Sequence, residues 1–245
     1  MKKSSKTQIT NISKMIAMTY EGKYGDYPIK LSKTWYDING VQWYTCEKDD
    51  TLYICIQGSR ANKDNNKDWK DNLNFKQIKS PGIKSHKFHE GHYEQTLVIY
   101  RQIIKLYKSY KNVYICGHSL GGALAQILAM LMSYSKIRIP KTVRVITEGA
   151  PRSMNYSAAR WFNKNISESI RIVNGDDPVT KVPFRITLFW MYWHVKGKMQ
   201  IGTKKGILKR LLKWKQWRKE KLNHSPLDYT VNLTKYYWSK YNKNK

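Results

Sequence analysis

The chain has 245 residues, 41% of them hydrophobic, which is enough for the core of one α/β domain. Its formal net charge of +28 favours contact with anionic surfaces, such as phospholipid head groups or nucleic acid, but indicates no fold. The three cysteines, Cys46, Cys55 and Cys116, are odd in number and lack metal-ligand spacing, so we expect buried reduced thiols rather than disulfides or a metal site.

The N-terminus is basic, but no apolar stretch of signal-peptide length follows it. The longest apolar runs, residues 123–132 and 186–195, are too short to span a bilayer. Together with the reduced thiols, this predicts an intracellular protein, cytoplasmic or held at the periphery of a membrane. No internal repeat or linker divides the chain, so residues 1–245 are expected to form a single domain.

The first predicted element is a helix over residues 9–23, where apolar side chains recur at helical spacing. Two strands follow at 41–47 and 51–57, and the turn-like triplet 48–50 joins them into an antiparallel hairpin. A helix is also predicted over residues 89–110, because its apolar side chains recur at helical spacing.

Strands then alternate with helices along the rest of the chain. The predicted elements are a strand at 113–116, a helix at 121–134, a strand at 143–147, a helix near 158–163, a strand at 169–173, strands within 186–195 and a closing helix from about residue 227. This alternation predicts an α/β fold with a central, mostly parallel sheet, an antiparallel N-terminal hairpin and helices on both faces.

The most informative motif is Gly117-His118-Ser119-Leu120-Gly121, a G-x-S-x-G pattern between an apolar strand and an amphipathic helix. So tight a turn strains the backbone of the serine and leaves no room for side chains two residues either side, which explains both glycines. The turn exposes the hydroxyl of Ser119 above the sheet, where it is a candidate nucleophile.

A serine nucleophile needs a base and a group that orients the base, and in hydrolases of this type they follow in the order acid, then histidine. Asp176 and Asp177 come directly after the strand 169–173, and either one fits the acid. His224, in a loop just before a helix, is preferred as base over His194, which lies inside an apolar run. His118 is expected to be structural; His86, His89 and His92 precede the acid in the chain.

Attack on an ester forms an oxyanion that needs hydrogen-bond donors. One expected donor is the backbone N–H of Leu120, directly after the nucleophile, and the other comes from the loop after an earlier strand, where Gly58-Ser59 lies. The predicted chemistry needs no metal and no cofactor.

These motifs resemble the class 3 lipases, the fungal-lipase type of α/β hydrolase, from about residue 41 to residue 229. The segments that carry the resemblance are Gln57-Gly58-Ser59, Trp69, His89-Glu90-Gly91, Gly117-His118-Ser119-Leu120-Gly121-Gly122-Ala123, Gly149-Ala150-Pro151-Arg152, Asn174-Gly175-Asp176-Asp177-Pro178-Val179-Thr180-Lys181-Val182-Pro183, His194-Val195-Lys196-Gly197 and Asn223-His224 with Tyr229.

The resemblance implies an α/β-hydrolase fold and hydrolysis of lipid esters, either acylglycerols or phospholipids. It selects Asp177 as the triad acid, beside Ser119 and His224, and it implies that Ser59 and Leu120 form the oxyanion hole. The chain departs from the family pattern at Gln57, where the family has arginine, and at Asn72, where it often has an acid. The stretch 60–68, where the family has its lid, is polar rather than amphipathic.

Residues 204–221 carry leucines and tryptophans at roughly helical spacing among nine basic residues and one acid. Such a basic amphipathic segment predicts docking on an anionic membrane, although its apolar stripe would equally suit packing on the domain. No nucleic-acid motif accompanies the charge. The alternative to an enzyme is a weakly active or inactive hydrolase-fold protein that binds anionic membrane or nucleic acid. The sequence indicates no oligomeric state.

Overall fold

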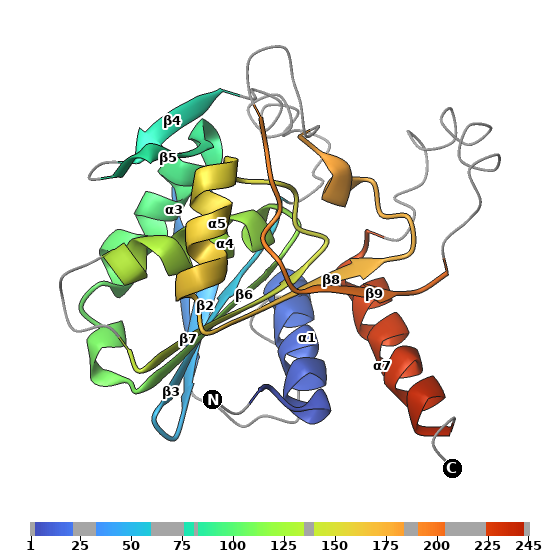
Figure 1. The fold of residues 1–245 in the computed structure, drawn as a ribbon. Helices are drawn as coiled ribbons and strands as arrows, with labels where there is room; N and C mark the ends of the chain where they lie inside the picture. Colours follow the sequence, from blue (N-terminus) through green and yellow to red (C-terminus); the bar gives the residue numbers. More distant parts are fainter. Residues whose placement is uncertain are drawn as a thin grey trace.

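The computed structural model describes residues 3–21, 33–59, 76–80, 83–134, 140–183, 191–203 and 224–242. A seven-stranded sheet in the order β1-β2-β3-β6-β7-β8-β9 forms its centre (Figure 1). The strands are β1 (Lys33–Ile38), β2 (Val41–Lys48), β3 (Thr51–Ile56), β6 (Asn112–His118), β7 (Thr142–Glu148), β8 (Glu168–Asn174) and β9 (Lys198–Ile201). The first three strands pair antiparallel and the remaining pairs are parallel, as the alternation predicted.

Helices cover both faces of this sheet. On one face α1 (Lys6–Glu21) and α7 (Pro226–Asn242) pack against each other, and on the other lie α3 (Glu90–Ile103), α4 (Leu120–Tyr134) and α5 (Tyr156–Asn165) (Figure 1). Because the sheet is covered on both sides, the molecule has two hydrophobic cores, one on each face.

Strand β6 shows how one segment of the sequence supplies apolar side chains to both cores. Ile115 packs into the core beneath α4, whereas its neighbours Tyr114 and Cys116 face the core beneath α1 and α7. All residues of β6 after Asn112 are buried. A parallel strand covered on both faces is apolar on both faces, which is why this segment reads as a continuous apolar run.

Helix α4 is buried at every position from Gly121 to Met132. Its composition of alanine, leucine, isoleucine and methionine therefore suits a helix enclosed on all sides. This helix supports the turn that carries Ser119, and its rigidity fixes that turn relative to the sheet.

Several elements differ from the predictions. The helix predicted over 89–110 ends at Ile103 and is followed by a separate 3-10 turn, Tyr107–Ser109. Of the stretch 186–195, expected to form strands, residues 186–190 lie outside the described ranges, and Trp193 forms an isolated antiparallel bridge with Met154. The last strand of the sheet, β9, instead comes later in the chain. Strand β1 and the two-stranded sheet of β4 (Gln77–Ser80) and β5 (Ile83–His89) were not predicted.

The basic segment 204–221, the polar stretch 60–68, Trp69 and Asn72 lie outside the residues that the structure describes. Within the described ranges, no helix combines the length and the apolar character needed to cross a bilayer.

Candidate active site

Ser119 occupies the turn between β6 and α4 with a φ of 56°, in the left-handed region that side chains rarely adopt. Its N–H donates to the carbonyl oxygen of Glu148 at 2.8 Å, which ties the turn to β7. A Cβ at Gly121 would overlap the carbonyl oxygen of Ile56, and one at Gly117 would overlap the backbone of Gly121. The glycines are thus required by the close approach of backbones on both sides of the serine.

A chain of hydrogen bonds joins Ser119 to His224 and Asp177. The Nε2 atom of His224 lies 2.8 Å from the Oγ atom of Ser119, and its Nδ1 atom lies 2.8 Å from the Oδ2 atom of Asp177. The Asp177 side chain is fully buried and that of His224 is 15% exposed, so one end of the chain is enclosed and the other borders solvent. The structure therefore brings together three residues from widely separated segments of the chain.

Asp177 accepts three hydrogen bonds. The Tyr229 hydroxyl donates to Oδ2 at 2.5 Å, and the backbone N–H of Val179 donates to Oδ1 at 2.9 Å, in addition to the contact with His224. Asp176 belongs to the turn after β8 and is partly exposed. Of the two aspartates left open by the residue pattern, Asp177 is the one beside the imidazole.

Tyr229 has a direct part in this site that helical spacing alone does not indicate. It is fully buried on the first turn of α7, and its hydroxyl accepts from the backbone N–H of Asn174 at 3.1 Å while donating to Asp177. Burial, and then the nearby carboxylate of Asp177, raise the pKa of Tyr229 well above its usual value. The hydroxyl thus stays neutral and remains a donor to Asp177.

His118 lies closer to the site than a purely structural residue would need to. Its ring centroid is 4.6 Å from that of His224, and its Nδ1 atom is 2.7 Å from the Tyr20 hydroxyl. Burial lowers the pKa of His118 well below its usual value, so the ring is neutral and its Nδ1 accepts from Tyr20. The same hydroxyl accepts from the backbone N–H of Gly58 at 2.9 Å.

The two expected oxyanion donors come from the segments on either side of the nucleophile turn, the loop after β3 and the start of α4. A Cβ built on Gly58 would lie 2.8 Å from the Cβ of Ser119, so the loop that continues into Ser59 abuts the serine. Leu120 is the first residue of α4. Its N–H therefore belongs to the first helical turn, whose N–H groups have no acceptor within the helix.

The remaining histidines have other surroundings. The Nε2–H group of His194 donates to the carbonyl oxygen of Thr180 at 2.7 Å, and burial, followed by the charge of Arg171, lowers the pKa of His194 to about 2. His89 accepts from the backbone N–H of His92 at 3.4 Å and caps α3. These contacts account for the histidines without a catalytic role.

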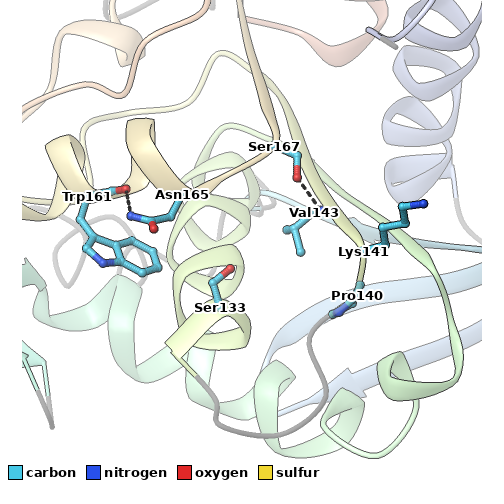
Figure 2. A pocket seen from close by; sticks show the side chains of 7 residues that line it. All are labelled: Ser133, Pro140, Lys141, Val143, Trp161, Asn165 and Ser167. Carbon is cyan, nitrogen blue, oxygen red and sulfur yellow. Dashed lines mark hydrogen bonds between the residues drawn. The ribbon is translucent and has the colours of Figure 1, made fainter. Parts of the chain in front are cut away.

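A hollow of about 220 Å³ has none of the residues of the Ser119 site in its lining (Figure 2). Its lining residues are Ser133, Pro140, Lys141, Val143, Trp161, Asn165 and Ser167. It opens where β7 and β8 begin, whereas Ser119 and Asp177 follow the carboxyl ends of β6 and β8. Among the described residues, no three His, Cys, Asp or Glu side chains gather closely enough to hold a metal ion.

Comparison with known proteins matches residues 53–187 to the family model described as lipase (class 3). The chain is 33% identical over 104 residues to Lipase ZK262.3 of Caenorhabditis elegans, a match that covers 42% of this chain and 29% of that protein. It is 38% identical over 90 residues to phospholipase A(1) DAD1, chloroplastic, of Arabidopsis thaliana, covering 35% of this chain and 20% of that protein. The chain thus spans less than a third of either relative's length.

The solved structure of the Rhizomucor miehei triacylglyceride lipase is similar over 80% of this chain and 79% of that chain, with a TM-score of 0.63 and 23% identity. At that identity the likeness establishes a shared α/β-hydrolase fold. Since the family model spans more than half of the residues, including Ser119 and Asp177, this chain belongs to the class 3 lipase family.

Proposed function

We propose that this protein is a serine hydrolase that cleaves the carboxylic ester bonds of lipids through an acyl-enzyme. The observation that carries the proposal is the unbroken hydrogen-bonded chain from the Ser119 hydroxyl through His224 to the buried carboxylate of Asp177. A nucleophile, a base and a group that orients the base are the three parts that ester hydrolysis of this kind requires.

In the first half of the reaction, the Oγ atom of Ser119 attacks the ester carbonyl carbon and His224 takes its proton. Asp177 holds the imidazole with Nδ1–H toward the carboxylate, which leaves Nε2 as the acceptor. His224 then gives the proton to the departing alkoxide, and the acyl group remains on the serine. In the second half, His224 takes a proton from water as the hydroxide attacks the acyl carbonyl carbon. It then returns that proton to the Oγ atom of Ser119 as the acyl–oxygen bond breaks and a fatty acid leaves.

Each tetrahedral intermediate carries a negative oxygen, and we assign its stabilisation to Ser59 and to the N–H of Leu120. Leu120 directly follows Ser119 at the start of α4, and Ser59 directly follows Gly58, whose position abuts Ser119. The positive end of the α4 dipole faces the same place. Loss of one such donor in other enzymes reduces kcat by about 10²–10³.

The proposal is tested with a fluorophosphonate probe, which labels activated serines. Wild type is expected to become labelled, and Ser119→Ala is expected to remain unlabelled. Ser133→Ala is the matched control, because Ser133 is a partly buried serine whose hydroxyl only donates to the carbonyl oxygen of Ala129. Absence of labelling of wild type, or equal labelling of Ser119→Ala, would refute the proposal.

A second measurement identifies the head group of the lipid substrate. One relative named above is a lipase and the other a phospholipase A(1), so both acylglycerols and phospholipids are candidates. The net charge of +28 favours anionic phospholipid. Lipidomic analysis of the products released from mixed vesicles is expected to show lysophospholipid and free fatty acid; release from acylglycerols alone would exclude phospholipid.

The same proposal includes docking of the basic segment 204–221 on an anionic membrane. Each Lys or Arg near an anionic surface contributes about 1 kcal/mol. Flotation with vesicles is expected to recover the protein with phosphatidylserine but not with neutral lipid alone. Equal recovery with both kinds of vesicle would contradict this docking.

A further inference from the structure

Glu148 is a fully buried acid at the end of β7, beside the turn that carries Ser119. Its carbonyl oxygen accepts from the N–H of Ser119 at 2.8 Å, and in the sheet it is directly opposite His118. The proposed reaction gives its side chain no task. A buried acid so close to a reactive serine therefore calls for its own explanation.

The side chain of Glu148 connects the sheet to both helices of its face. The Ser13 hydroxyl of α1 donates to Oε1 of Glu148 at 2.5 Å. The Ser13 oxygen in turn lies 3.0 Å from the hydroxyl of Thr230, on the first turn of α7. The Thr230 hydroxyl also lies 3.3 Å from the carbonyl oxygen of Pro226 and 3.4 Å from that of Ser13, so these contacts share its single proton. His224 lies two residues before α7, so this relay ends on the helix that directly follows the proposed base.

The surroundings of Glu148 suit a neutral acid. Its Oε2 atom is buried and has no hydrogen-bond partner among the residues that the structure describes. Three titratable groups face Glu148 directly: Tyr20 from α1, His118 from β6 and Tyr229 from α7. The next residue along the chain, Gly149, lies against the side chains of His224 and Asp177.

None of these facing groups supplies a positive charge at neutral pH with which a buried Glu148 carboxylate could pair, since the contact of His224 is directed to Asp177. An isolated buried carboxylate is strongly unfavourable. Burial accordingly raises the pKa of Glu148 from its usual value near 4.5 to about 8, and the Ser13 hydrogen bond offsets this only in part.

We infer that Glu148 is a positioning residue that acts as a neutral acid and, when it ionises, loosens the packing through which α1 and the first turn of α7 hold His224 against Ser119. Ionisation of Glu148 adds an uncompensated charge to this relay. Hydration of that charge competes with the packing of α1 and α7 against the sheet. The inference rests on the proposed hydrolase function. The inference predicts that kcat for ester hydrolysis declines at alkaline pH. With a neutral histidine base alone, kcat would stay constant there.

The direction of the expected pH dependence follows from the raised pKa of Glu148. The folded chain holds the Glu148 proton more tightly than the unfolded chain does, so the contribution of Glu148 to native stability is fully present below about pH 4.5 and is lost as pH rises through about 8. Above that pH, titration of one group lowers the population of the competent form by up to about tenfold per pH unit.

The test is a pH profile, with kcat and KM measured separately on a soluble short-chain ester. For wild type, kcat is expected to fall above about pH 8. Glu148→Gln, which keeps the shape but cannot ionise, is expected to retain kcat at pH 7 within about threefold and to lose the alkaline decline. Ser13→Ala removes the bond that lowers the pKa, so its decline should move to higher pH. Thr10→Ala, an exposed change on the same helix, should leave the profile unchanged.

An alkaline decline of equal size and midpoint in wild type and folded Glu148→Gln would overturn the inference, and so would a constant wild-type kcat up to pH 10. A second readout does not depend on catalysis. The infrared band of a protonated carboxyl group, present at pH 6 in wild type and missing from Glu148→Gln, reports the neutral acid even if no ester is cleaved. Loss of fluorophosphonate labelling at pH 7 would refute the hydrolase proposal, whereas absence of that band would refute the role of Glu148.

Discussion

Replacement of Tyr229 by phenylalanine removes one oxygen atom from the centre of the site. The lost hydroxyl donates to the Oδ2 atom of Asp177 at 2.5 Å and accepts from the backbone N–H of Asn174 at 3.1 Å. Tyr229, Asp177 and Asn174 are each 0% exposed, so no water replaces the missing partner.

The magnitude follows from these two bonds. A hydrogen bond to a charged group contributes about 1.5–3 kcal/mol, and a buried donor left without an acceptor costs about 1–3 kcal/mol. The free energy of unfolding is therefore expected to fall by about 3–5 kcal/mol. For a chain of this size the midpoint of thermal unfolding falls by about 2–4 °C per kcal/mol. Because Asp177 is then less firmly held behind His224, kcat should also fall, with little change in KM.

The assays are urea unfolding and hydrolysis of a soluble ester. Tyr237→Phe serves as the control, since that half-buried hydroxyl on the same helix only contacts the sulfur of Met199 at 3.8 Å. Its stability should change by less than about 0.5 kcal/mol. If Tyr229→Phe unfolds at the same urea concentration as Tyr237→Phe and keeps its kcat, Tyr229 does not support Asp177 and the reasoning fails.

Other substitutions probe the turn and the rejected base. Gly121→Ala places a Cβ against the carbonyl oxygen of Ile56 and is expected to cost more than about 3 kcal/mol in urea unfolding; near-native stability would contradict the packing described. Ser119→Gly should be about 1 kcal/mol more stable than Ser119→Ala, because only glycine adopts a φ of 56° without strain, and equal urea midpoints would argue against strain. His194→Gln should keep fluorophosphonate labelling, since His194 donates to Thr180; loss of labelling by the folded variant would reopen its candidacy as base.

The elements that local pattern predicts well are those whose surroundings are uniform. The buried run of β6, the enclosed helix α4 and the turn between them follow from composition and glycine spacing, and the hairpin of β2 and β3 follows from its turn. Strand β1 and the pair β4–β5 carry mixed polar and aromatic residues without a clear period. Their pairing depends on partners elsewhere in the chain, and local spacing does not reveal it.

The same limit applies to the site. Ser119 carries a local signature, and the chain order that such a serine implies limits the acid to Asp176 or Asp177 and the base to His194 or His224. The resemblance to the lipase family selects Asp177, and the loop position favours His224. Tyr20 and Glu148 have no such signature. Tyr20 reads as one apolar position of a helix, yet its hydroxyl lies 98 residues in sequence from its partner His118. Glu148 reads as a strand residue, and the Ser13 hydroxyl that explains its burial is 135 residues away.

The three cysteine thiols lie on the same face of β2, β3 and β6, beneath α1 and α7, and are at most 1% exposed. An alkylating reagent can reach them only when these helices lift or the strands separate. The ratio of their reaction rate to that of an open thiol gives the free energy of that opening directly. The reactivity of these three thiols therefore measures how stably α1 and α7 pack against the strands that lead to Ser119. The measurement can be made in any buffer, membrane or variant.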